Sequence, residues 1–300
     1  MVPAAVDEFA LLGENADEAG LEREGRPPVH RTEVALADGR SLSAIVWGER
    51  QPELVLLHGG AQNAHTWDTV ALALARPLVA IDLPGHGRSS WRQDGRYQPA
   101  SMADDVGVAI RSLAPRAHAV VGMSLGGLTA IALAARQPDL VRRLVLVDVT
   151  PGVNAEKSAA IVAFVAGPPT FPSFESLLER TVEHNPTRSR SSLRRGLLHN
   201  AVELEDGTWG WRHHVGRGGA HGPEPADFSA LWEDLSSLTM PLLLVRGRLS
   251  PVVDDADVDE LQRRQPGARV EVVDGAGHSI QGDRPVELAT VLEQFVEIVV

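Results

Sequence analysis

The chain has 300 residues, of which 43% are hydrophobic, with a net charge of −12 and a pI near 5.4. This length and composition suit one large α/β domain or two small ones with a full hydrophobic core. The acidic balance argues against nucleic acid or an anionic membrane as a partner, and the lack of cysteine excludes disulfides, thiolate metal sites and cysteine nucleophiles.

The first thirty residues are predicted to form an N-terminal extension, an acidic helix followed by a loop. Asp and Glu stand where a secretory signal would have Lys or Arg ahead of an apolar run. No stretch of the chain approaches the roughly eighteen apolar residues that span a bilayer. We therefore expect a cytoplasmic protein with no membrane or nucleic-acid partner, either a monomer or a homodimer.

Short apolar runs alternate with helical patterns through residues 31–150 and 239–300, the predicted core. Residues 31–48 are predicted to form a hairpin that turns at Asp38-Gly39, and Ser101 is predicted to cap the helix that follows it. The later strands are apolar almost throughout, which is typical of parallel strands that helices cover on both faces. These segments predict an α/β fold with a mostly parallel, eight-stranded sheet.

The alternation stops between residues 151 and 238, after the sixth core strand. Helical patches and a Trp-, His- and Gly-rich stretch occupy this segment. We expect a helical cap over the carboxyl ends of the strands, where open α/β sheets bind ligands. Its histidines, His213, His214 and His221, are expected to face solvent rather than line a pocket, and their spacing does not favour a metal site.

Gly122, Ser124 and Gly126 form a G-x-S-x-G pattern between a predicted buried strand and a predicted helix of small residues. Glycines leave room for a sharp turn that exposes the serine hydroxyl at the positive end of a helix. A serine hydroxyl needs a base to accept its proton, and histidine suits that role near neutral pH. We therefore predict that Ser124 is a nucleophile.

Four motifs occur in order along the chain: HGG at 58–60, DLPGHGRS at 82–89, GMSLGG at 122–127 and GAGHS at 275–279. By these motifs the chain resembles the α/β-hydrolase family from about residue 31 to residue 300, apart from the cap. The resemblance implies that His278, in the loop after the last core strand, is the catalytic base. It also implies oxyanion donors at the backbone N–H groups of Leu125 and Gly60, with Ala61 as an alternative.

Four further residues are predicted to border the substrate pocket: Trp67, Met123, Trp209 and Trp211. A place in the hydrophobic core is the alternative for Trp67, and a place in the cap's own core is the alternative for Trp209 and Trp211. Two histidines, His58 and His86, match loop residues of the family that support the turns, so we expect structural roles for them.

The acid of the triad departs from the family's pattern. Most members place an aspartate shortly after the seventh core strand, where this chain has Ser250 followed by Pro251. Asp148, at the end of the sixth strand, occupies the place that haloalkane dehalogenases and zearalenone-type lactonases use. An acid at a strand end is fixed more firmly than one in a helical turn, so we predict Asp148, with Asp254 or Asp255 as the alternative acid.

A serine nucleophile excludes the aspartate-based chemistry of dehalogenases and epoxide hydrolases with this fold. We expect a carboxylic-ester or lactone hydrolase that acts on small to medium apolar substrates through an acyl-enzyme, with no metal or organic cofactor. Two alternatives remain: C–C bond hydrolysis or cofactor-free oxygenation on the same fold, and a non-catalytic ligand-binding homologue. The Ser124–His278 pair argues against the last, because a pure binding protein does not need it.

Overall fold

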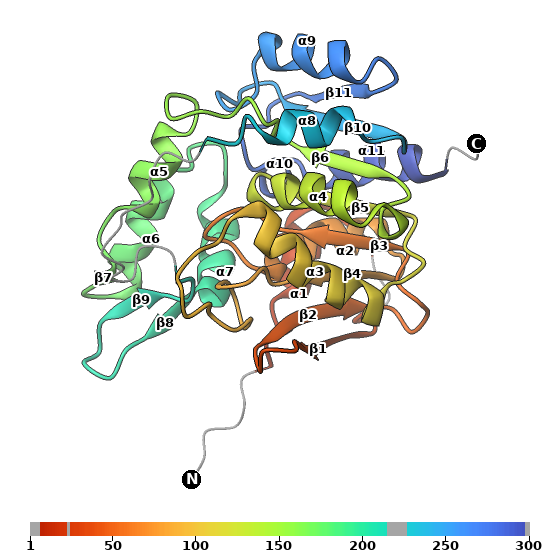
Figure 1. The fold of residues 1–300 in the computed structure, drawn as a ribbon. Helices are drawn as coiled ribbons and strands as arrows, with labels where there is room; N and C mark the ends of the chain where they lie inside the picture. Colours follow the sequence, from red (N-terminus) through yellow and green to blue (C-terminus); the bar gives the residue numbers. More distant parts are fainter. Residues whose placement is uncertain (1–6, 23–24, 215–226, 298–300) are drawn as a thin grey trace.

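A computed structural model of the protein describes residues 7–22, 25–214 and 227–297. Its centre is an eight-stranded sheet with the order β1-β2-β4-β3-β5-β6-β10-β11 (Figure 1). β2 pairs antiparallel with β1 and β4, and every other pair in this sheet is parallel, so the predicted α/β architecture is confirmed. The strands are β1 (Val29–Ala35), β2 (Ser41–Trp47), β3 (Leu54–Leu57), β4 (Leu78–Ile81), β5 (Ala119–Met123), β6 (Leu144–Val147), β10 (Leu242–Gly247) and β11 (Arg269–Val273).

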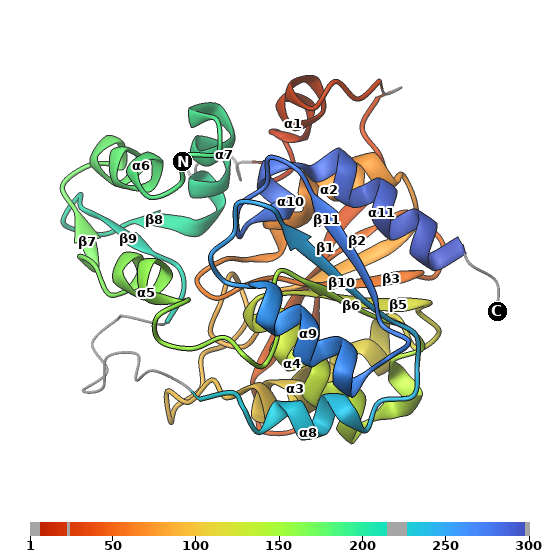
Figure 2. The same cartoon turned by 90° about the horizontal axis from the view of Figure 1, so that it is seen from above.

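Helices cover both faces of this sheet, as the apolar strands required (Figure 2). On one face of the sheet, a layer of core side chains packs against four helices: α3 (Pro99–Leu113), α4 (Leu125–Arg136), α8 (Leu231–Ser236) and α9 (Asp255–Arg264). On the opposite face, a second layer of core side chains packs against α1 (Leu12–Glu18), α2 (Asp68–Leu74), α10 (Ile280–Asp283) and α11 (Pro285–Glu297). Because side chains alternate along a strand, Val55 and Leu57 of β3 pack in the first layer, and Leu54 and Leu56 pack in the second.

The first hairpin forms where it was predicted. Gly39 adopts a φ of +85° at the turn, a conformation that favours glycine, and the Leu36 N–H donates to the Arg40 carbonyl at 2.8 Å. The prediction for Ser101 is wrong, because α3 already begins at Pro99, which is suited to a first helical position. The Ser101 hydroxyl instead donates to the Gln98 carbonyl at 2.9 Å.

The segment between β6 and β10 contains strands as well as the predicted helices. A small antiparallel sheet, β7-β9-β8, lies beside the main sheet together with three helices (Figures 1 and 2). These elements share a separate hydrophobic cluster, whereas Leu231, Trp232 and Leu235 of α8 belong to the main core. The elements are α5 (Ala159–Val165), β7 (Thr170–Phe171), α6 (Phe174–Glu183), α7 (Arg190–Asn200), β8 (Ala201–Glu203) and β9 (Trp209–Trp211).

The predicted acidic helix near the N-terminus is present as α1, which packs on the main core through Leu12 and Ala16. Its polar side contacts α7: Arg195 donates to Asn15 Oδ1 at 2.6 Å and also pairs with Glu18. α1 therefore connects the main domain to α7. None of the helices in the described part of the chain is both long and apolar enough to cross a membrane.

Candidate active site

The turn after β5 holds Ser124 in a conformation that few non-glycine residues adopt. Its φ is +50° and its ψ is −119°, and α4 begins at the next residue, Leu125. A Cβ atom on Gly122 would lie 2.4 Å from the Gly126 carbonyl oxygen, and one on Gly126 would lie 2.4 Å from the Leu57 carbonyl oxygen. The glycines therefore allow strand and helix to approach closely, and such a strained turn is typical of a nucleophilic serine.

His278 follows β11 and lies next to Asp148, which follows β6. The Nδ1 atom of His278 is 2.8 Å from Asp148 Oδ2, as expected for an N–H donated to a carboxylate. β6 pairs directly with β5, so Asp148 leaves the sheet one strand away from Ser124. The parallel order of β5, β6, β10 and β11 brings these three predicted residues to the same edge of the sheet.

Two further contacts fix the Asp148 carboxylate, whose side chain is completely buried. The Gly247 N–H donates to Oδ1 at 2.9 Å, and the Ser250 hydroxyl donates to Oδ2. Asp148 itself has a φ of +51°. Ser250 comes just before Pro251 in the loop where most family members have their acid, and its hydroxyl contacts Asp148, the predicted acid. Sequence reasoning gave Ser250 no role, because its contact with Asp148 joins residues 102 positions apart.

The alternative acids have other partners. Asp254 is the N-cap of α9, where it accepts from the Asp257 N–H at 3.0 Å, and it also pairs with Lys157 at 2.9 Å. Asp255 pairs with Arg246, and its side chain is 94% exposed. Neither carboxylate contacts His278 within the described structure, and an N-cap acid is explained by helix capping alone.

The loop after β3 and the start of α4 lie side by side, as an oxyanion site requires. A Cβ atom on Gly60 would lie 3.8 Å from the Leu125 side chain. Leu125 is the first residue of α4, so its N–H has no acceptor within the helix. Ala61 adopts a φ of +59°, and its carbonyl accepts from Asn200 at 2.6 Å. Asn200 at the end of α7 is a contact to this loop that sequence reasoning missed.

The predicted pocket residues separate into two groups. Trp67 and Met123 are almost completely buried in the core layer that packs with α2 and α11, so each occupies the core position that its apolar side chain favours. Trp209 packs edge-on against Phe174 in the cluster beside the main sheet. Of these four residues, only Trp211 borders the cavity next to Ala61 and Ser279.

The histidines of the main-domain loops have structural contacts, as expected. His58 is completely buried, and its Nε2 accepts from the Leu83 N–H at 2.9 Å while Nδ1 donates to the Gly59 carbonyl at 2.7 Å. Burial lowers the pKa of His58. His86 is also buried, and its Nδ1 lies 3.0 Å from the Pro84 carbonyl oxygen. The His58–Leu83 hydrogen bond and the contact between the His58 and His86 rings join the loops after β3 and β4.

The expectation that His213 and His214 face solvent is wrong. His213 is only 2% exposed and stacks on Trp211, because the cluster around β9 closes over it. His214 lies 2.6 Å from the Tyr97 hydroxyl and stacks on Trp91. Both residues therefore help to hold β9 against the loop after β4. His221 lies outside the described residues.

A cavity of about 150 Å³ lies between the loop after β3, α7 and α10. Ala61 and Gln62 border it on one side and Ser279 on another, so its wall includes the chain neighbours of Gly60 and His278. Ser124, Asp148 and His278 do not themselves line it. Polar side chains make up much of the wall, in contrast to the apolar pocket that the sequence suggested.

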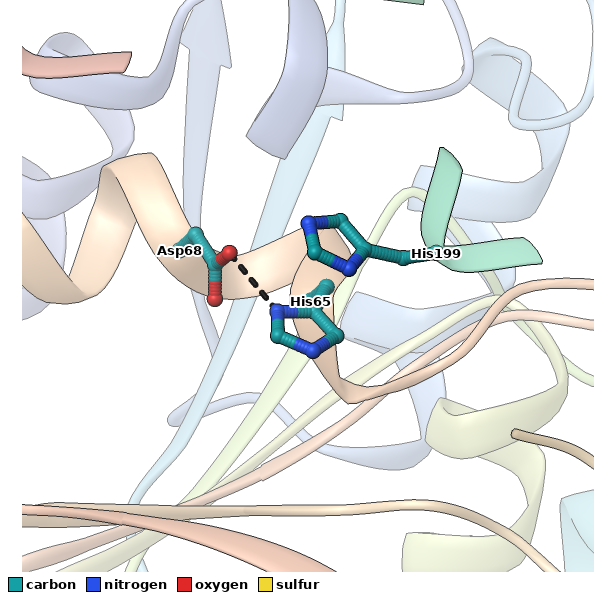
Figure 3. A group of neighbouring side chains, drawn as sticks. All are labelled: His65, Asp68 and His199. Atoms are coloured by element: carbon teal, nitrogen blue, oxygen red, sulfur yellow. Dashed lines mark hydrogen bonds and ion pairs between the residues drawn. The ribbon is translucent and has the colours of Figure 1, made fainter. Parts of the chain in front are cut away.

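One wall of this cavity holds His65, Asp68 and His199, whose potential ligand atoms lie within 4.8 Å of one another (Figure 3). His65 Nδ1 donates to Asp68 Oδ2 at 2.8 Å, and the rings of His65 and His199 stack with centroids 3.6 Å apart and planes 13° from parallel. Nitrogen lone pairs lie in the ring plane, so nearly parallel rings do not direct them at one point. Arg31 Nη2 also lies 3.2 Å from His65 Nε2. This arrangement favours a charged structural cluster over a tetrahedral metal site.

The protonation of this cluster follows from its neighbours. Burial opposes a charge on His65, yet Asp68 and Glu8 raise its pKa to about 9. Burial and the nearby charge of His65 lower the pKa of His199 to about 3. A cationic His65 and a neutral His199 are therefore expected at neutral pH.

The chain belongs to the α/β-hydrolase fold family, whose sequence profile matches residues 52–285. It is 47% identical to esterase Rv0045c of Mycobacterium tuberculosis, over 96% of this chain and 95% of that protein. It is 30% identical to the sn-1-specific diacylglycerol lipase ABHD11 of Xenopus laevis, over 82% of this chain and 80% of the lipase. A solved structure of the M. tuberculosis esterase covers 98% of this chain and 100% of its own, with a TM-score of 0.86 at 45% identity.

Proposed function

We propose that this protein is a serine hydrolase that cleaves carboxylic esters, with Ser124, His278 and Asp148 as its triad. The observation that carries the proposal is the strained Ser124 turn together with the 2.8 Å contact between His278 and Asp148. Similarity to an esterase over nearly the full length supports ester hydrolysis as the reaction. Lactones are cyclic esters and belong to the same proposal.

The proposed mechanism assigns one task to each group. His278 accepts the proton of the Ser124 hydroxyl as its oxygen attacks the ester carbonyl, and Asp148 stabilises the resulting imidazolium through Nδ1. The N–H groups of Leu125 and Gly60 stabilise the oxyanion, with Ala61 as the alternative donor. His278 then protonates the leaving alcohol, and water activated by the same imidazole releases the acid.

The segment between β6 and β10 is proposed to act as a cap that selects the substrate. Phe164 and Trp211 from this segment border the cavity and offer an apolar surface to a small or medium acyl chain. In this proposal the core comprises residues 31–150 and 239–300, and the cap lies within residues 151–238, of which α8 packs on the core. The protein is proposed to be a cytoplasmic monomer or homodimer. Size-exclusion chromatography with light scattering measures the oligomeric state.

The test is hydrolysis of p-nitrophenyl acetate and butyrate by wild type and Ser124→Ala. We expect the substitution to lower kcat/KM by roughly four or more orders of magnitude, because it removes the nucleophile. A fluorophosphonate probe should label Ser124 in the wild type and not in the variant. Ser229→Ala, at an exposed serine, is the matched control and should keep wild-type activity. Hydrolysis that survives Ser124→Ala would contradict the proposal.

A further inference from the structure

Three residues that line the cavity, Arg188, Gln281 and Asp68, each have a buried polar atom with no hydrogen-bond partner in the described structure: Nε, Oε1 and Oδ1 respectively. Buried polar atoms in proteins almost always have a partner, and an unpartnered one costs free energy. Residues with unused hydrogen-bonding capacity therefore gather around this cavity, which favours a polar occupant.

The positive charge of Arg188 indicates which charge that occupant would carry. Its Nη2 donates to the Ser192 hydroxyl at 2.9 Å, but it forms no ion pair with any described carboxylate. Burial lowers the pKa of Arg188 and the charge of Asp283 raises it, and a guanidinium remains protonated in either case. Asp283 Oδ2 accepts instead from Thr187 at 3.0 Å and from the Gly277 N–H at 2.8 Å, and Asp283 Oδ1 has no hydrogen-bond partner in the described structure. A partly buried cation without a direct counter-ion favours an anionic ligand.

Arg195, another arginine on the cavity wall, differs from Arg188 because it has a carboxylate partner. It donates to Asn15 and pairs with Glu18, so its charge is already balanced. The charge of His65 is likewise balanced by Asp68, the only carboxylate among the described residues that line this cavity. Arg188 is therefore the cation of this wall that is left for a ligand.

Arg188 also borders a wider hollow of about 670 Å³ on its other side. That hollow combines three carboxylates, Glu18, Asp283 and Glu287, with Arg195 and Arg284, so its charges are balanced without an anionic ligand. The smaller cavity combines Arg188 with amide side chains and with the apolar surfaces of Phe164, Leu193, Leu197 and Trp211. A short apolar chain that ends in an anion fits this combination.

Gly282 leaves the space that the guanidinium occupies. A Cβ atom on Gly282 would lie 2.6 Å from Arg188 Cζ and 2.7 Å from its Nε. Gly282 follows His278 by four residues, in the short helix α10. The segment that contains His278, the proposed base, and α10 therefore also contacts the Arg188 guanidinium.

We propose that Arg188 binds a carboxylate at the far end of the ester substrate, so that the enzyme prefers monoesters of short dicarboxylic acids. This inference rests on the proposed ester hydrolysis at Ser124 and names its substrate class. The apolar part of the acyl chain packs against Phe164 and Trp211, and the carboxylate accepts hydrogen bonds from the guanidinium.

The experiment compares monoethyl adipate with ethyl hexanoate, two ethyl esters of six-carbon acids that differ in a terminal carboxylate. Acid release is followed in a pH-stat for wild type, Arg188→Met and Arg194→Met. Arg194 is an exposed arginine of α7, so its variant is the matched control. We expect wild type and Arg194→Met to prefer monoethyl adipate in kcat/KM by roughly tenfold to a hundredfold, the usual range for a hydrogen bond to a charged group. Arg188→Met should abolish this preference.

Gly282→Ala provides a second variant that keeps the charge and displaces the guanidinium, so it should also reduce the preference. Thermal unfolding checks that each variant folds. If wild type shows no preference, or if Arg188→Met slows both esters equally, the anion site is wrong while ester hydrolysis stands. If wild type hydrolyses neither ester in a Ser124-dependent way, both the site and the proposed function are wrong.

Discussion

The protein contains two His–Asp pairs with the same geometry and different surroundings. In each, Nδ1 of the histidine lies 2.8 Å from Oδ2 of the aspartate: His278 with Asp148, and His65 with Asp68. His278 lies in a loop at the edge of the sheet where the Ser124 turn also lies. His65 instead stacks on His199 and has Arg31 at 3.2 Å from its Nε2.

The difference shows that a hydrogen-bonded His–Asp pair is not by itself a catalytic unit. A general base needs its other nitrogen free for the nucleophile and a pKa that allows it to gain and lose a proton. The Nε2 of His65 faces a guanidinium, and its pKa of about 9 keeps the ring charged at neutral pH. We therefore assign His65 a structural role, in which its charge links the loop after β3 to α7. We assign the proposed proton transfer to His278 and Asp148.

The largest expected effect tests the proposed catalytic pair, His278 and Asp148. Asp148→Asn should lower kcat/KM by roughly a thousandfold to ten-thousandfold, because the amide no longer stabilises the imidazolium or fixes its tautomer. Steady-state hydrolysis of p-nitrophenyl butyrate measures it, with circular dichroism to confirm folding. Asp254→Asn and Asp255→Asn are the controls. If Asp148→Asn is active and either control is inactive, the acid lies after β10.

The second effect tests the structural pair through pH. The pKa of His65 is raised from 6.5 to about 9, so its stabilising contribution is present below pH 6.5 and is lost as pH rises through 9. We expect this loss to be on the order of 3 kcal/mol in the free energy of unfolding. Urea denaturation between pH 6.5 and 9.5 measures it, and His65→Asn should flatten the profile. A flat wild-type profile would mean that His65 is neutral and accepts a hydrogen bond from Arg31.

A third, smaller effect concerns the contact that orients Asp148. Ser250→Ala removes one hydrogen bond to the carboxylate and leaves the Gly247 N–H in place. We expect kcat to fall by about fivefold, since a net hydrogen bond contributes about 1 kcal/mol. Ser250→Thr, which keeps the hydroxyl, should recover most of the loss. Wild-type kcat in Ser250→Ala would show that the backbone contact alone fixes Asp148.

The smallest expected effect distinguishes two roles for Asp254, which follows β10: a helix cap and a catalytic acid. Asp254→Ala should lower the free energy of unfolding by about 1 kcal/mol, because it removes the N-cap of α9. Its kcat should stay close to that of wild type. Denaturant unfolding and ester hydrolysis on the same preparation measure both quantities. A large fall in kcat without a fall in stability would restore Asp254 as a candidate acid.

Local patterns explain why much of the fold was predictable. Apolar strands with glycine-rich ends, helical periodicity and the Gly122–Gly127 turn are properties of neighbouring residues, so they are visible without the tertiary structure. The same holds for the helical turn that contains Asp254. The burial of His213 and the small sheet β7-β9-β8 were not predictable, because each depends on which distant segment packs against the residues concerned.

The α/β architecture, the candidate nucleophile Ser124 and the candidate base His278 could be read from the chain alone, since short motifs with strong backbone requirements mark each of them. Which aspartate lies against His278 became clear only from the folded chain, because β6, β10 and β11 meet through strand pairing rather than chain proximity. Folding alone also brought Arg188 of the inserted segment beside Gly282 of the core. Charge and hydrogen bonding at that contact depend on three-dimensional neighbours, and no spacing along the chain encodes them.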